Sequence, residues 1–160
     1  MSTAAPNVMK LAEALVLRAD SQRRIEQLRE RLKFSALVQE GDRPPEDPQT
    51  LLAELDRLLT QLAVLIAHIN RTNSQTPLGN YGSLTEALAQ RDVLKLRYSV
   101  LKSAADAASR RIDHYSRSEI RNVATVDVAS LRQQTDRLAQ QFRELDTAIQ
   151  GANWVTDLLT

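Results

Sequence analysis

Apolar residues recur along this chain at the spacing of amphipathic α-helices. Between Pro48 and Thr72 they alternate at intervals of four and three, at Leu51, Leu55, Leu58, Leu62, Leu65 and Ile69. This spacing keeps the side chains on one side of a helix. A second row runs beside the first, at Leu52, Leu59 and Ile66. The apolar face is therefore wider than a two-stranded coiled coil needs, and it predicts packing in a multi-helix core.

The same pattern predicts three further helices. One covers about residues 9–37, one runs from Ser83 to Arg111 or Tyr115, and one follows Asp127. Three of the four helix starts carry capping signals, namely Asp47-Pro48 before the second helix, Ser83 to Glu86 before the third and Asp127 before the fourth. Pro and Gly residues in segments 40–46 and 76–83 break the helical pattern between them.

The sequence contains an internal repeat. Leu11, Glu13, Ala14, Leu15 and Arg18 recur 73 positions later, and Asp47, Asp56-Arg57-Leu58, Ile69 and Asn73 recur 80 positions later. Two copies of one helical hairpin predict an all-α, up-down-up-down four-helix bundle. We expect a flexible tail at residues 1–8 and one domain at 9–160, with repeats at 9–76 and 83–156. The β-branched segment 120–126 is expected to pair with 36–39 as a small two-stranded β-ribbon.

Composition excludes several classes of function. There are 21 basic and 20 acidic residues among 160 and no cysteine. The balanced charge gives no electrostatic drive towards nucleic acid, and thiolate chemistry is excluded. The longest apolar run, residues 62–67, is far shorter than the roughly 20 residues of a membrane span. No signal peptide is evident at the N-terminus, so we expect a cytoplasmic protein.

Two arginines are the sharpest candidates for a functional site. Arg18 and Arg91 continue the apolar rows of their helices and are predicted to point inwards. An inward guanidinium needs acceptors, because an unpaired buried charge is costly. The predicted polar layer comprises Arg18, Asn70, Asn73, Arg91 and Asn153, with Gln150 and Asp157 as further acceptors for Arg91. Such a layer favours a role in helix register, and a ligand pocket is the alternative.

The remaining chemical signals are weaker. Glu86 is best explained as the partner of Ser83 in a capping box, and Glu13 does not face Arg18 across one helix turn. His114 and nearby carboxylates match no metal-ligand spacing, so no metal or cofactor is expected. A candidate interaction segment with one aromatic ring and mixed charge comprises Tyr115, Ser116, Arg117 and Glu119. Its simpler interpretation is a solvated helix end.

Several sequence blocks resemble the septicolysin-like family of small bacterial helical proteins. The blocks are Met9 to Leu15, Leu51 to Leu55, Ile69 to Asn73, Tyr115 to Ile120, Val126 to Val128 and Asn153-Trp154. The resemblance covers residues 9–159 and implies a cytolysin, with no catalytic residues to carry over. His114 and the leader before Met9 depart from the family pattern.

Three functions follow from these patterns. The favoured one is a non-enzymatic helical bundle that forms homo-oligomers, such as dimers, or binds a protein partner, with Leu52, Leu59 and Ile66 left for the interface. The alternative is a septicolysin-like membrane-active toxin, against which the charge-rich helices stand. An enzyme built around Arg18 and Arg91 lacks a phosphate-binding loop or a nucleophile–base pair.

Overall fold

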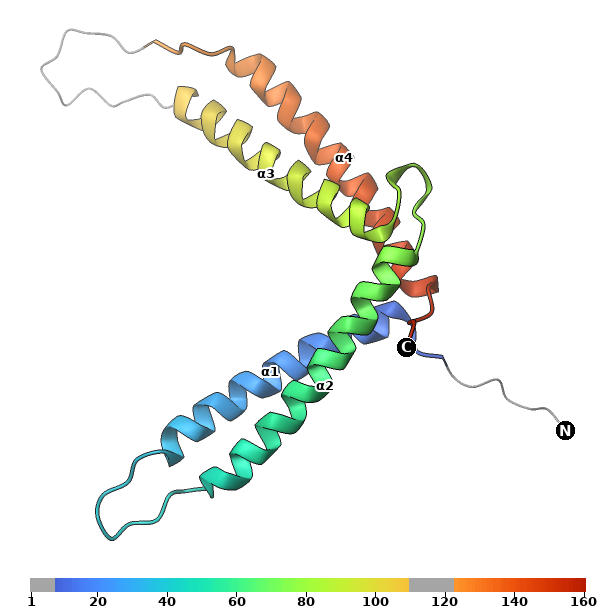
Figure 1. Cartoon of the computed structure of the whole chain (residues 1–160). Coiled ribbons are helices and arrows are strands. Elements are labelled where there is room, and N and C mark those ends of the chain that lie inside the picture. The colour runs from blue at the N-terminus through green and yellow to red at the C-terminus, as the bar shows by residue number, and fades with distance from the viewer. Residues whose placement is uncertain (1–7, 110–122) are drawn as a thin grey trace, which may run out of the picture. The chain divides into compact units, whose positions relative to one another are not determined.

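The computed structural model describes residues 8–109 and 123–160. These residues form α1 (Leu11–Ser35), α2 (Pro48–Gln75), α3 (Leu84–Ser109) and α4 (Val128–Val155), with a short 3-10 turn at Gly79–Tyr81 (Figure 1). No sheet occurs in the described part of the chain, so the predicted all-α fold is confirmed.

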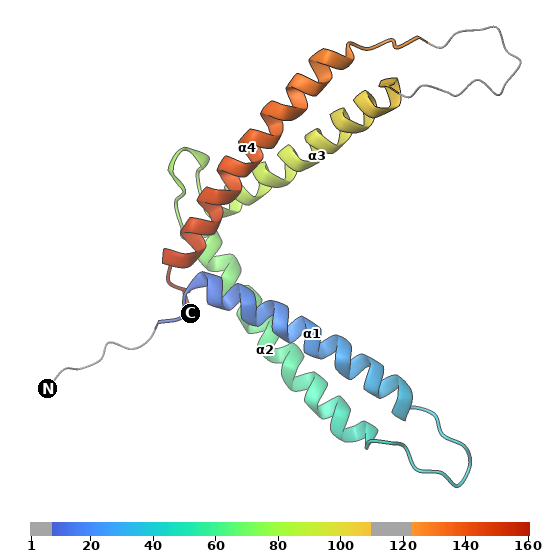
Figure 2. The same cartoon turned by 180° about the vertical axis from the view of Figure 1, so that it is seen from behind.

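The helices form two antiparallel hairpins, one of α1 with α2 and one of α3 with α4 (Figures 1 and 2). The chain divides into two compact units. The first comprises the chain up to Thr76 together with Gly151–Thr160, and the second comprises Pro77–Gln150. The division after Thr76 coincides with the predicted end of the first repeat.

One row of side chains closes each hairpin. On α1 it advances by alternating steps of three and four residues through Leu11, Ala14, Arg18, Ser21, Ile25, Leu28, Leu32 and Ser35, all buried or half-buried. The corresponding row on α3 lies 73 positions later, at Leu84, Ala87, Arg91, Leu94, Tyr98, Leu101, Ala105 and Ala108. The two N-terminal leucines are 0% exposed. The repeat therefore preserves the heptad register of both helices.

The partner helices also share a register. On α2 the row includes Leu51, which is 2% exposed, and Ile69, which is 1% exposed. On α4 the positions 80 residues later include Leu145 and Ile149, each 1% exposed. Each hairpin thus encloses one row of buried and half-buried side chains per helix.

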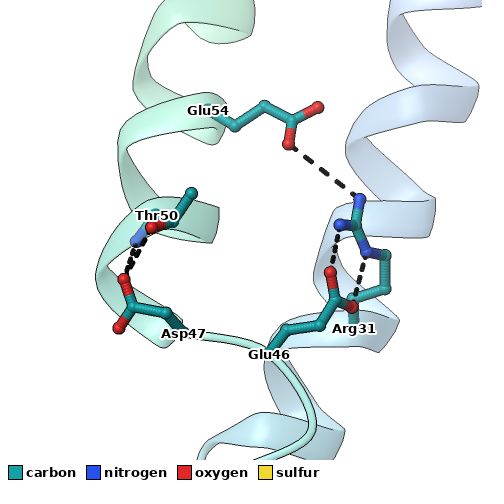
Figure 3. A network of polar contacts seen from close by, with 5 residues as sticks. All are labelled: Arg31, Glu46, Asp47, Thr50 and Glu54. Atoms are coloured by element: carbon teal, nitrogen blue, oxygen red, sulfur yellow. Dashed lines mark hydrogen bonds and ion pairs between the residues drawn. The ribbon is translucent and has the colours of Figure 1, made fainter.

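Acidic caps fix where α2 and α4 begin. The Asp47 carboxylate accepts hydrogen bonds from the Thr50 amide at 3.0 Å and the Thr50 hydroxyl at 2.6 Å (Figure 3). These bonds lower the pKa of Asp47, the Thr50 side chain having the larger effect. Asp127 accepts from the Ser130 amide at 3.1 Å. The predicted caps are confirmed, and Pro48 follows at the first helical position.

An arginine ties the end of α1 to the start of α2. Arg31 donates through Nε to Glu46 at 2.9 Å, and its terminal nitrogen makes a second bond to the same carboxylate (Figure 3). Glu54 lies 3.9 Å from the guanidinium. The hydrogen bonds raise the pKa of Arg31 and lower that of Glu46. These groups are exposed, so the network positions the loop more than it stabilises the hairpin.

At the start of both α1 and α3, a glutamate accepts a hydrogen bond from the backbone amide of the residue just before the helix. Glu86 accepts from the Ser83 amide at 2.6 Å and the Ser83 hydroxyl at 2.8 Å, which confirms the predicted capping box. Glu13 does the same for the Lys10 amide at 2.7 Å. Gly82, at φ +79°, lies directly against the Glu86 carboxylate, where a Cβ would clash with it. A glycine is therefore required there.

The backbone contacts before α1 and α3 repeat as well. Lys10 forms an isolated antiparallel bridge with Asp157, and Ser83 forms one with Pro77. The Leu158 amide donates to the Met9 carbonyl at 2.8 Å, and the Leu78 amide donates to Gly82 at 2.7 Å. The segment before α1 is thus held by the segment after α4, and the segment before α3 is held by the segment after α2.

Some expectations fall beyond the described residues or differ from the structure. The ribbon between 36–39 and 120–126 is not formed as predicted, since 36–39 and 123–126 have no strand geometry and 120–122 lie outside the description. The backbone of 36–39 leads into the turn around Gly41 instead, with Asp42 donating to Gln39 at 3.0 Å. The tail (1–7) and the extension of α3 past Ser109 also lie outside.

The two N-terminal leucines provide a test of the repeated core. Leu11→Ala and Leu84→Ala should each lower the free energy of unfolding by about 2–5 kcal/mol, because each leaves a cavity. Urea denaturation followed by circular dichroism measures the loss. Val64→Ala, at a side chain 52% exposed, serves as the control. A small loss for either leucine, similar to the control, would contradict the assignment of that residue to the core.

The Glu86 cap predicts a pH dependence of stability. Its hydrogen bonds from Ser83, the backbone one first, lower the folded-state pKa below its ordinary value. The stabilisation is therefore present above the unfolded-state pKa of about 4.3 and is lost as the pH falls through the folded-state pKa. Glu86→Gln should make urea midpoints less dependent on acidification from about pH 6 to about pH 3. Glu40→Gln, in the exposed loop, should leave the wild-type dependence unchanged.

Candidate binding faces

Arg91 belongs to the inner row of α3, is half-buried and has carboxylate partners. Its guanidinium lies 3.4 Å from Asp146 of α4 and 3.1 Å from the neighbouring Asp92. The sequence predicts its acceptors at Gln150, Asn153 and Asp157, whereas the observed partner lies one turn before Gln150 on α4. The half-buried guanidinium of Arg91 therefore finds its acceptor in an ion pair within the second hairpin.

Arg18 occupies the equivalent position of the first hairpin but lacks the equivalent carboxylate. The position that corresponds to Asp146 is Ile66. Arg18 is half-buried and makes no hydrogen bond or ion pair to any residue of 8–109 or 123–160. The divergence between the repeats thus removes the carboxylate that the second hairpin supplies at this position.

The asparagines of the predicted layer are distributed unevenly. Asn153 is 7% exposed, Asn73 is half-buried and Asn70 is exposed. Neither Asn70 nor Asn73 is hydrogen-bonded to Arg18. The polar layer therefore stays a prediction, with the Arg91–Asp146 pair as the interaction present in the structure.

The other chemical candidates do not converge on a site. Tyr115, Ser116, Arg117 and Glu119 lie outside the described residues. Across residues 8–109 and 123–160, no three His, Asp or Glu side chains are close enough to hold a metal ion. The first hairpin has an open groove of about 600 Å³ whose lining includes Met9, Val64, Leu65 and Leu158, with His68 as its titratable side chain.

The second apolar row of α2 is an uncovered surface, which we call the α2 face (Leu52, Leu59 and Ile66). Leu52 is 42% exposed and Leu59 is 45% exposed, while Ile66 is half-buried. The hairpin leaves this row uncovered because α1 packs against the neighbouring row that includes Leu51. The equivalent residues of α4 are Arg132, Ala139 and Asp146. An apolar face therefore exists on one repeat and is absent from the other.

A second uncovered surface runs along α3, opposite its inner row. Val93 is 64% exposed, Leu96 is 65% exposed and Val100 is 58% exposed. Together with small neighbours they form the α3 stripe, which comprises Ala89, Val93, Leu96, Val100, Ser103 and Ala107. This stripe was not among the predicted surfaces, although its alternating steps of four and three are a signal for it in the sequence. The matching α1 positions are mostly polar, including Asp20, Arg23 and Gln27.

Comparison with known sequences and structures shows the family of this chain. Residues 18–158 match the model of the Family of unknown function (DUF6847). The chain belongs to this family. It is also similar to a functionally unknown conserved protein from Corynebacterium diphtheriae, known from its crystal structure, at 44% identity and a TM-score of 0.90. That match covers 96% of this chain and 100% of the other. No curated protein matches the chain.

The resemblance to the septicolysin-like family was wrong. The family model that matches is DUF6847, and the similar crystal structure carries no cytolysin description. The shared blocks, such as Leu51 to Leu55, are short runs of helix-forming residues that many amphipathic helices contain. Among the described residues, no helix has the length and apolar character needed to cross a membrane.

The divergence between the two arginines can be measured. A double-mutant cycle of Arg91→Ala and Asp146→Ala should give a coupling of about 0.5 kcal/mol, because the pair is partly exposed. Added salt should reduce the coupling. The matched cycle, Arg18→Ala with Ile66→Ala, should show no salt-dependent coupling. Equal salt dependence in the two cycles, measured by urea denaturation, would contradict the difference described here.

Proposed function

We propose that this protein is a non-enzymatic binding module that acts by taking up another protein helix on the α2 face. The observation that carries the proposal is the uncovered row of Leu52, Leu59 and Ile66, which the duplicated hairpin replaces with Arg132, Ala139 and Asp146. Folding alone does not explain the apolar row, because the second hairpin folds without one. A partner helix that covers it gains about 25 cal/mol for each Å² of apolar surface removed from water.

Arg18 supports a preference of the α2 face for a partner helix that carries an acidic residue. In the second hairpin the equivalent arginine reaches the residue at the Ile66-equivalent position, 3.4 Å away. Because the two hairpins share this register, we expect Arg18 to lie near Ile66, at one end of the α2 face. A carboxylate on the incoming helix would supply the acceptor that Asp146 supplies to Arg91. The partner expected here is an amphipathic helix with leucine-like residues at heptad spacing and an acidic flank.

Site-specific photo-crosslinking in the native cells tests this proposal. A photoreactive amino acid at position 59 should give a discrete adduct, whereas the same group at Arg57, on the exposed side of α2, should not. Leu52→Glu should abolish the adduct at position 59, because it places a charge in the covered row. Arg132→Glu, at the equivalent position of α4, should leave it intact. The mass of the adduct distinguishes a second copy from a different protein.

Two results would count against the proposal. Equal labelling from positions 59 and 57 would mean that the α2 face is not covered. An adduct that survives Leu52→Glu would mean that the apolar row does not bind the partner. Circular dichroism of the purified variants checks that helix content is retained, which is expected because Leu52 is already 42% exposed.

A further inference from the structure

We infer that the α3 stripe is a dimerisation surface, on which the α3 stripe of a second copy packs in parallel. This surface is separate from the α2 face, and the inference stands independently of the proposed function. Its three large side chains are more exposed than Leu52 or Leu59, at 58–65%. Helix α3 is thus apolar on two sides, with one side directed to α4 and the other uncovered.

The stripe has the residue order of a two-stranded coiled coil. Taking Val93 and Val100 as a positions makes Leu96 the intervening d position. β-Branched residues at a with leucine at d favour parallel dimers. Smaller residues extend the same heptads at both ends, at Ala89, Ser103 and Ala107. The stripe is roughly 27 Å long at the α-helical rise, which is short and indicates moderate affinity.

Charges beside the stripe select the parallel arrangement. In this register Asp92 is a g residue and Arg97 is the e residue five positions later. Parallel pairing brings Asp92 of each copy to Arg97 of the other, which forms two attractive contacts about the dyad. Arg97 makes no ion pair within the described residues, and Asp92 is 70% exposed with Arg91 bound at Oδ1, which leaves Oδ2 available.

The antiparallel alternative brings like charges together. Keeping the whole stripe in contact then places Leu96 against Val100 of the second copy. That register sets Asp92 opposite Asp106 and Arg97 opposite Arg97. Like charges at these flanking positions disfavour association. A second copy in parallel therefore satisfies both the apolar stripe and the charges that flank it.

Sedimentation equilibrium of the full chain tests the dimer over low to high micromolar concentrations. The wild type should show a monomer–dimer equilibrium, and Val100→Glu should raise the dissociation constant at least about tenfold. The matched control is Gln27→Glu, which adds the same charge at the equivalent position of α1 and should leave the constant unchanged. A monomeric wild type, or a Val100→Glu variant that dimerises as well as the wild type, would overturn the inference.

Charge reversal and a single cysteine test the direction of pairing. Asp92→Arg should weaken dimerisation, and the double change Asp92→Arg with Arg97→Asp should restore it. An antiparallel dimer predicts instead that Asp92→Arg strengthens association, by pairing with Asp106. The chain has no cysteine, so Val93→Cys should oxidise to a disulfide-linked dimer in a parallel arrangement. Strengthening by Asp92→Arg, or no disulfide at position 93, would overturn the parallel dimer. Loss of the dimer would leave the crosslink at position 59 unaffected.

Discussion

The structure depends on a simple geometric constraint, which is that two helices in a hairpin cover only one row of side chains on each other. The end positions of the inner row of α2, Leu51 and Ile69, are 2% and 1% exposed, and the positions between them are half-buried. Any additional apolar row must stay in water or be covered by something outside the hairpin. Because α2 and α3 each carry a second row, the uncovered faces follow directly from the two-helix arrangement.

Duplication provides an internal reference for deciding which residues serve folding. Asp47 and Asp127 both cap a helix, and Glu13 and Glu86 both close one, so these positions keep their structural role in both copies. Differences between the copies concentrate elsewhere. Ile66 replaces the carboxylate that Asp146 provides to Arg91, and the loss leaves Arg18 without a protein acceptor in the described residues. Such divergence separates requirements of folding from features specific to one hairpin.

The sequence predicted the fold better than the site, for a physical reason. Helix identity, capping and register depend on local spacing, so the Ser83–Glu86 box and the Asp47 cap could be derived from residue order alone. The division into two units depends on contacts between segments that are distant in sequence, and the four-three pattern of α2 does not specify those contacts. The partner of Arg91 was misplaced by one turn, because side-chain reach is not encoded in spacing. The α3 stripe was overlooked because its residues are smaller and less numerous than the inner row.

The two uncovered faces differ in a way that bears on their partners. Ile66 occupies the position of the carboxylate that binds Arg91, so the Ile66 end of the α2 face lacks the acceptor that the second hairpin supplies and calls for a different, acidic chain. The α3 stripe lies between Asp92 and Arg97, which are complementary to each other when two copies align. A surface whose flanking charges satisfy a copy of themselves favours self-association, whereas one with a single unmatched charge favours a heterologous partner. Both apolar rows are specific to one repeat, since the equivalent positions of the other are mostly polar.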